Sequence, residues 1–232
     1  MPKFTFECSI PNVARTCTLA LHNIQSLKAH IQDLRAHKTL IQADCICLTE
    51  TWLDEDIDNV PELPGFIFKH NPRANCYDNS EPLFAELRQQ QRGGVGIYFL
   101  DNIDINVIIP ERSNLECLYF EVPRVNLTAA VLYRPNSYTI GMFRQQLLQV
   151  ICKLEKHPGR KVIMGDLNED IFKSCTILKL MEEHGYTQQV QTATTEKGTL
   201  IDHVYIKGTE DVIVEVVQTY YSVHEAILIS FL

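Results

Sequence analysis

The segment from residue 161 to residue 168 combines a short apolar run with two polar residues that are suited to hydrolytic chemistry. The apolar run is typical of a buried central strand. Asp166 and Asn168 stand where this strand ends, and they project to the same side because alternate residues of an extended chain share a face. A carboxylate beside an amide can hold and polarise a water molecule. The alternative is a plain turn, since Gly, Asp and Asn are the common turn residues.

Other apolar segments also end in a polar residue. A carboxylate that closes a buried strand without a partner costs several kcal/mol, so we expect a cation or a donor near Glu50. A hard cation such as Mg²⁺ suits that position because it needs only one or two carboxylates besides water and phosphate. Taken one by one, these groups have ordinary structural explanations as turn amides, local pairs or core histidines. We hypothesise that the strand-end groups converge on one pocket; they are Asn23, Glu50, Tyr133, Asp166, Asn168, Asp202 and His224.

The positions of these groups depend on many short strands and three main helices. Amphipathic patterns predict helices over residues 27–38, with Ser26 as the N-cap, 143–154 and 174–184. Residues 71–91 show no clear period and are expected to form a long surface loop with at most a helical turn at 83–88. This arrangement favours a sandwich over a doubly wound sheet. Strands are predicted at 4–10, 16–22, 43–49, 66–70, 93–100, 106–109, 117–122, 127–132, 161–166, 199–206, 212–217 and 226–232.

Length and composition favour one domain over residues 1–232, since the chain is 45% apolar and 22% charged and has no repeat or linker. No apolar run approaches the ~20 residues of a membrane helix, and the N-terminus lacks the apolar core of a signal peptide. Eight scattered cysteines without zinc spacing indicate reduced thiols in an intracellular protein. The net charge of −8 does not decide between nucleic acid and a smaller phosphate ester, because metal-dependent phosphodiesterases concentrate carboxylates at their sites.

Three further features are expected to serve structure. Trp52 is interpreted as a packing residue, as large aromatic side chains usually are. Gly93 and Gly94 open a strand and indicate close packing of backbones, because a phosphate loop would need a Lys-Ser/Thr ending and a following helix. The arginines at positions 73, 88 and 92 are interpreted as solvated surface residues, although phosphate contacts stay open for them.

Six segments in sequence order resemble the endonuclease/exonuclease/phosphatase superfamily, the fold of apurinic/apyrimidinic endonucleases and of bovine pancreatic deoxyribonuclease. The resemblance implies a four-layer α/β sandwich in which two packed mixed sheets are flanked by helices. Segments 50–53 and 133–136 are most similar to endonuclease domains of mobile elements, namely LINE-type retrotransposons and endonuclease-bearing Helitrons. That similarity implies a nuclear protein and a domain that stands alone or belongs to a larger transposon polyprotein. The six segments are 21–27, 48–51, 133–136, 165–168, 200–203 and 222–224.

The resemblance also implies a role for each matching residue. Glu50 and Asn23 would hold Mg²⁺ or Mn²⁺, and Asp166 would orient or deprotonate the attacking water. Asp202 would hold the imidazole of His224 against the scissile phosphate. The implied reaction is attack of water on a DNA phosphodiester, which leaves a 3′-hydroxyl and a 5′-phosphate. The remaining implied contacts are Asn168 and Tyr133 as catalytic groups, and Arg134, Asn136 and Thr195 as substrate-binding groups.

Two positions depart from the family pattern. Val223 stands where the family usually has an aspartate at the metal site, and Gln25 stands where some members have another. Fewer carboxylates weaken a hard-cation site, because affinity follows ligand charge and number. Val223 either faces the cation or packs into the core. Two alternatives therefore stay open beside an active DNA endonuclease: a catalytically impaired nucleic-acid-binding module, and a phosphatase or deadenylase of the same superfamily.

Overall fold

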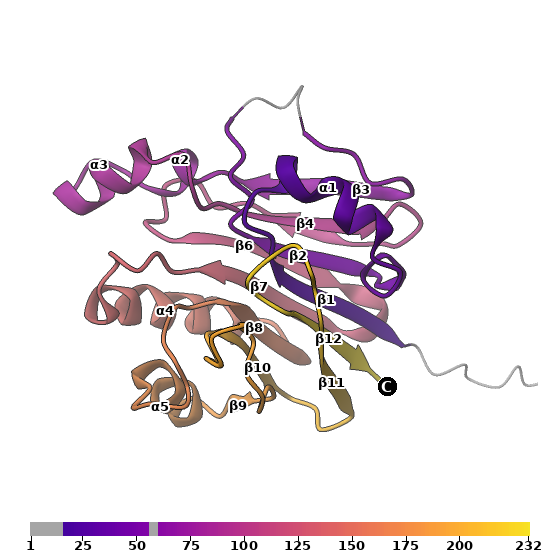
Figure 1. Ribbon diagram of the computed structural model, residues 1–232. Helices are drawn as coiled ribbons and strands as arrows, with labels where there is room; N and C mark the ends of the chain where they lie inside the picture. The colour runs from indigo at the N-terminus through magenta and orange to yellow at the C-terminus, as the bar shows by residue number, and fades with distance from the viewer. Residues whose placement is uncertain (1–15, 56–59) are drawn as a thin grey trace, which may run out of the picture.

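A computed structural model describes residues 16–55 and 60–232, and in this part of the chain two six-stranded mixed sheets pack face to face between layers of helices (Figure 1). The first sheet has the order β11-β12-β1-β2-β4-β3 and the second β5-β6-β7-β8-β10-β9. This is the predicted sandwich. The predicted strand at 4–10 lies outside the described residues.

The first sheet consists of β1 (Cys17–Asn23), β2 (Cys45–Thr49), β3 (Phe66–Asn71), β4 (Val95–Leu100), β11 (Val212–Val217) and β12 (Ala226–Phe231). The second consists of β5 (Asn106–Ile108), β6 (Glu116–Val122), β7 (Leu127–Tyr133), β8 (Arg160–Asp166), β9 (Thr187–Gln188) and β10 (Asp202–Lys207).

The helices cover the outer faces of the two sheets. On the first sheet, α1 (Leu27–Ala36) buries Leu27, Ile31 and Leu34, and the Ser26 hydroxyl caps it by accepting the Ala29 N–H, as predicted. On the second sheet lie α4 (Ile140–Leu154) and α5 (Thr176–Glu183), whose apolar residues share one buried cluster with β6, β7 and β8. A further apolar core fills the space between the sheets. Because both faces of each sheet are covered, the central strands are continuous apolar runs.

The predicted long loop at 71–91 is wrong in part, since it contains the short helices α2 (Arg73–Cys76) and α3 (Pro82–Gln89). Pro82 opens α3 at a first-turn position, where a missing N–H costs nothing. The helix buries only Phe84 and Leu87 against the second sheet. Two apolar residues are too few to set up a recognisable period, so the sequence pattern indicated a helical turn at 83–88 but not the full helix.

Strand direction gathers the polar strand ends at one edge of the sandwich. β1 runs parallel to β2 and β7 parallel to β8, so these four strands end on the same side within each sheet. β10 and β12 run antiparallel to β8 and β1 and therefore begin where those strands end. The register pairs Asp166 with both Tyr133 and Asp202. A bridge between Thr195 and His224 joins segments that lead into different sheets.

All seven cysteines in the described part are free, and Cys8 lies outside it. Within the same residues, no helix combines the length and apolar character needed to cross a membrane.

Candidate active site

The amide of Asn23 stands at the centre of the strand-end groups. Its Nδ2 donates to Glu50 Oε1 at 2.9 Å and to Asp166 Oδ2 at 2.8 Å, and it lies 3.4 Å from His224 Nε2. These four residues come from β1, the end of β2, the end of β8 and the start of β12, so both sheets contribute. The structure thus brings together groups that lie up to 201 positions apart in the chain.

A carboxylate–imidazole pair forms one side of this cluster. His224 Nδ1 lies 2.8 Å from Asp202 Oδ2, and the Thr194 hydroxyl donates to the same oxygen at 2.7 Å. The Asp202 pairing fixes the ring so that Nε2 faces Asn23 and Asp166. Sequence reasoning missed Thr194. Its signal was weak, since only a hydroxyl residue eight positions before Asp202 marked it.

Asp166 and Asn168 form the other side. The Asn168 N–H donates to Asp166 Oδ1 at 3.0 Å, while its Nδ2 donates to the Arg134 carbonyl at 2.8 Å. Asn168 has a left-handed backbone (φ 51), which is the conformation that a tight turn after β8 requires. The segment is therefore both a turn and a holder of the Asp166 carboxylate.

Arg134 has a different role from the predicted substrate contact. Its side chain is buried, and its Nε and Nη2 each donate at 2.6 Å to the carbonyls of Leu167 and Asn168. A third donor, Nη1, reaches the Tyr138 carbonyl. The guanidinium therefore supports the loop that carries Asn168, and the sequence prediction is corrected accordingly.

The other predicted substrate contacts differ in placement. The Thr195 hydroxyl bonds to Thr199 Oγ1 at 2.6 Å within its own turn, and its assignment as a substrate-binding group stays a prediction. Asn136 is exposed just after β7. Tyr133 is buried at the end of β7, where burial and the Glu50 and Asp166 carboxylates raise the pKa of its hydroxyl, so this group stays protonated.

Two residues near the site were interpreted wrongly from the sequence. The Trp52 indole N–H donates to Glu50 Oε2 at 3.0 Å, so Trp52 also orients the Glu50 carboxylate. Arg73 is buried rather than solvated, and its Nε lies 2.7 Å from the buried Glu116 carboxylate. Gly94 confirms the expected close packing, because a Cβ there would meet the Thr51 hydroxyl at 2.8 Å.

Left-handed backbone conformations concentrate at this edge of the sandwich. Five of the eight described non-glycine residues with positive φ lie in the loops that end β1, β2 and β8. Such conformations cost of order 1–3 kcal/mol each and persist where the surroundings over-determine them. The five residues are Gln25, Ser26, Glu50, Trp52 and Asn168.

The surroundings raise the pKa values of both Asp166 and His224. Burial, followed by the nearby Asp202 carboxylate, raises the pKa of Asp166 to about 8. Burial acts to lower the pKa of His224, but the charge and hydrogen bond of Asp202 outweigh it and raise that pKa to about 9. At neutral pH these shifts leave the imidazole positively charged and the Asp166 carboxyl largely protonated, and Asp166 becomes a proton acceptor as the pH rises through about 8.

The donor set fits a hard divalent cation at Glu50. Both oxygens of this carboxylate accept only neutral N–H donors, from Asn23 and Trp52, and no lysine or arginine pairs with it among the described residues. Among the described residues, the buried Asp202 Oδ1 has no hydrogen-bond partner either. Asn23 presents its NH₂ group rather than its oxygen to the cluster, so Glu50 is the principal candidate ligand. Gln25 contributes an amide oxygen that accepts the Val223 N–H at 3.3 Å, and neither residue offers a carboxylate.

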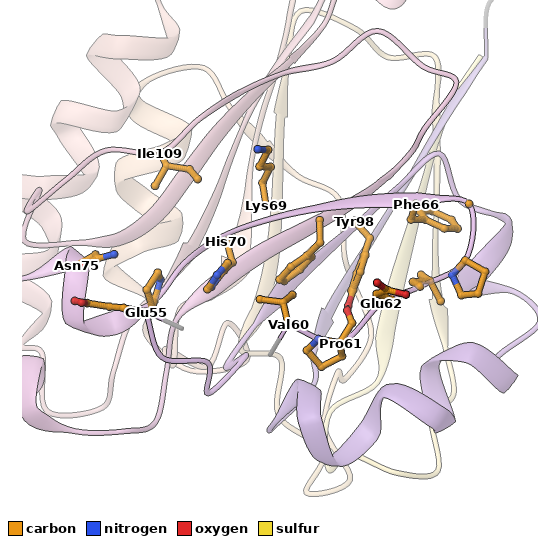
Figure 2. A pocket seen from close by; sticks show the side chains of 15 residues that line it. Glu55, Val60, Pro61, Glu62, Phe66, Lys69, His70, Asn75, Tyr98 and Ile109 are labelled. Atoms are coloured by element: carbon orange, nitrogen blue, oxygen red, sulfur yellow. The ribbon is translucent and has the colours of Figure 1, made fainter. Parts of the chain in front are cut away.

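A hollow lies elsewhere on the molecule, away from the strand-end cluster. A cavity of about 680 Å³ opens between β3 and the segment from Val60 to Gly65, and Figure 2 shows His70 and Tyr98 on its wall. None of the candidate catalytic residues lines it. The strand-end cluster, and not this cavity, is the candidate active site.

The two mixed sheets, their helical layers and the polar cluster at one edge define the DNase I-like class of α/β sandwich proteins. Residues 20–224 match the model of the Endonuclease/Exonuclease/phosphatase family, so the chain belongs to this family, whose members are hydrolases of phosphate esters.

Solved structures of similar fold include three nucleic-acid enzymes. The endonuclease domain of TRAS1, a telomere-specific non-LTR retrotransposon, superposes with a TM-score of 0.65 at 14% identity, over 94% of this chain and 98% of that one. An AP endonuclease from Archaeoglobus fulgidus gives 0.66 at 15% identity, over 93% and 99%. The 3′ phosphatase NExo from Neisseria, bound to a product DNA hairpin, gives 0.62 at 16% identity, over 93% and 99%.

Among curated sequences, a UPF0294 protein of Vibrio vulnificus (strain YJ016) is 32% identical over 123 residues, which are 49% of this chain and 43% of that protein. The match spans less than half of that relative's length.

Proposed function

We propose that this chain is a divalent-cation-dependent phosphodiesterase of mobile-element type that nicks DNA and leaves a 3′-hydroxyl and a 5′-phosphate. The observation that carries the proposal is the convergence of two carboxylates and an imidazole on the Asn23 amide. This arrangement places a proton acceptor, a cation ligand and a positively charged donor around one point. Such a set matches the needs of in-line attack by water on a phosphodiester.

His224 stabilises negative charge on the phosphate, and Asp166 acts as the proton acceptor. His224, charged at neutral pH and held by Asp202, directs Nε2 at the phosphate and stabilises the negative charge that develops on its oxygens. In its deprotonated form, which predominates above about pH 8, Asp166 accepts the proton of the attacking water, and the Asn168 N–H and the Asn23 amide keep its two oxygens in place. The buried Thr194 hydroxyl fixes Asp202 in turn.

The proposed cation, Mg²⁺ or Mn²⁺, would be held by Glu50. When bound, it would stabilise negative charge on the phosphate. The Trp52 indole and the Asn23 amide orient the Glu50 carboxylate toward that position.

The test is incubation of the protein with supercoiled plasmid and Mg²⁺ or Mn²⁺. We expect nicked circles that DNA ligase reseals, because ligase requires a 3′-hydroxyl and a 5′-phosphate. Asp166→Asn and His224→Gln should each lower the nicking rate by about 10²–10⁴-fold, the usual contribution of general acid–base groups. The melting temperature of Asp166→Asn should stay close to that of the parent, because asparagine has nearly the same shape as aspartate and fills the same space. The exposed Asp211→Asn is the matched control and should nick like the parent.

A specific observation favours a second candidate, a nucleic-acid-binding module without catalysis. Gln25 and Val223 place no carboxylate beside Glu50, which lowers the expected affinity for a hard cation. DNA binding without nicks at millimolar Mg²⁺ and Mn²⁺ would establish that candidate. Release of phosphate from small monoesters without nicking would instead indicate a phosphatase.

A further inference from the structure

A hollow of about 630 Å³ lies next to Trp52 and contains none of the candidate catalytic residues. Its lining residues are Ser26, Trp52, Gln90, Gln91 and Arg92. Trp52 is shared between the hollow and the catalytic cluster, because its indole N–H donates to Glu50 Oε2 at 3.0 Å. A molecule that fills the hollow therefore contacts the same side chain that orients the candidate cation ligand.

A stacked arginine gives this hollow its chemical character. The Arg92 guanidinium carbon lies 5.1 Å from the centre of the Trp52 ring, within the range of a cation–π contact. Arg92 is exposed and forms no ion pair with any described residue. The guanidinium thus lies over the indole on an exposed side chain. An unpaired, oriented guanidinium matches the oxygens of a phosphate.

The loop that carries Arg92 is held in place by the protein interior. Its Gln90 Oε1 accepts the Arg73 Nη1–H at 3.0 Å, and its Gly93 carbonyl accepts the Trp52 N–H at 2.8 Å. Arg73 is itself buried against Glu116. Because the loop is anchored at both sides of Arg92, the side chain loses less conformational freedom when a ligand binds.

We propose that Trp52 and Arg92 form a subsite for a second phosphate of a polynucleotide strand, next to the phosphate that is hydrolysed. The inference rests on the proposed function and deepens it, because it names a polymer with several phosphates as the substrate class. Arg92 binds the phosphate oxygens, and the indole supports the guanidinium and the adjoining sugar or base. In a chain of net charge −8, the positive charge of Arg92 also attracts the strand toward the cluster.

The test measures binding of a fluorescein-labelled duplex by anisotropy in EDTA over a range of salt concentrations, followed by steady-state nicking of the same duplex with Mg²⁺. We expect Arg92→Gln to weaken binding several-fold, to reduce the slope of log affinity against log salt by about 1, and to raise KM more than it lowers kcat. Arg92→Lys keeps the charge and should recover the salt slope but only part of the affinity, because it lacks the planar fork. The matched control is Arg144→Gln, an exposed arginine on α4.

Three outcomes decide the matter. Weaker binding and a shallower salt slope for Arg92→Gln than for Arg144→Gln support the subsite. Equal affinity and slope for the two variants, with a parent that binds and nicks DNA, overturn the subsite and leave the proposed function intact. A parent that neither binds nor nicks DNA overturns both.

Discussion

At the scale of single residues, Val223 is the position where this chain departs most clearly from its family. The side chain is 45% exposed, so the alternative of a core position is wrong. Its backbone N–H donates to Gln25 Oε1, which places it in the loop that reaches His224. Val223 is therefore a surface residue that precedes His224 and contacts Gln25 through its backbone.

We expect Val223→Asp to strengthen Mg²⁺ binding and to raise the nicking rate, because it adds a hard anionic ligand near Glu50. The unfolding free energy should change by no more than about 0.5 kcal/mol, as is usual for surface substitutions. Calorimetric Mg²⁺ titration and thermal melting measure the two effects. Ile109→Asp adds the same charge at another partly exposed position and should leave Mg²⁺ affinity unchanged. A Val223→Asp protein with the parent's Mg²⁺ affinity would contradict the expectation.

At the scale of secondary-structure elements, the buried Arg73–Glu116 pair ties α2 to β6 and to the start of β4. Glu116 is fully buried and accepts from Arg73 Nε, Tyr77 and the Gly94 N–H. Burial raises the pKa of Glu116, and the charge of Arg73 acts against this rise. Three elements thus share one desolvated charge pair.

Glu116→Gln should lower the unfolding free energy by about 3–5 kcal/mol, because it leaves the Arg73 charge buried without a counter-ion. The double variant Arg73→Met with Glu116→Met should recover a large part of that loss, since it removes both charges. Urea denaturation of the single and double variants measures the coupling. The exposed pair of Lys207 and Glu155 is the control, and Glu155→Gln should cost at most about 1 kcal/mol. Similar losses for Glu116→Gln and Glu155→Gln would contradict this interpretation of the pair.

At the scale of the whole molecule, two buried histidines make stability depend on pH. Burial lowers the pKa of His22 to about 3 and that of His203 to about 4. An unfolded histidine has a pKa of about 6.5. Below that pH the unfolded chain binds protons that the native chain does not, so the native state loses stability as the pH falls. His224 has the opposite shift and loses its contribution only as the pH rises toward 9.

We expect the unfolding free energy to fall between pH 6.5 and pH 4 by about 1.4 kcal/mol per pH unit for each of these two histidines. His22→Gln and His203→Gln should each reduce the slope of unfolding free energy against pH by about 1.4 kcal/mol per pH unit, which corresponds to one proton. Urea denaturation at pH 7, 6 and 5 measures the slopes, and His157→Gln at a partly exposed histidine is the control. A slope that neither buried-site variant changes would assign the acid sensitivity to other groups.

The sequence alone indicated most of the described strands and the polar residues at their ends, although the two-residue strand β9 was not predicted. Asp166 and Asn168 after an apolar run, and the stripe of Leu27, Ile31 and Leu34 in α1, follow from periodicities of two and 3.6 residues, which local chain geometry fixes. The polar strand ends could be predicted to converge because parallel strands end at a common edge of a sheet.

The partner that each of these side chains contacts depends on how distant parts of the chain pack together. Loop paths and sheet register set three of the contacts at the site. They are the contacts of Trp52 with Glu50, of Thr194 with Asp202, and of Arg134 with the Leu167 carbonyl. The buried pair of Arg73 and Glu116 joins residues 43 positions apart. An arginine in an unpatterned segment has the same local sequence signature whether it is solvated or buried. Its environment is set by packing between distant elements, and for that physical reason the sequence left it undetermined.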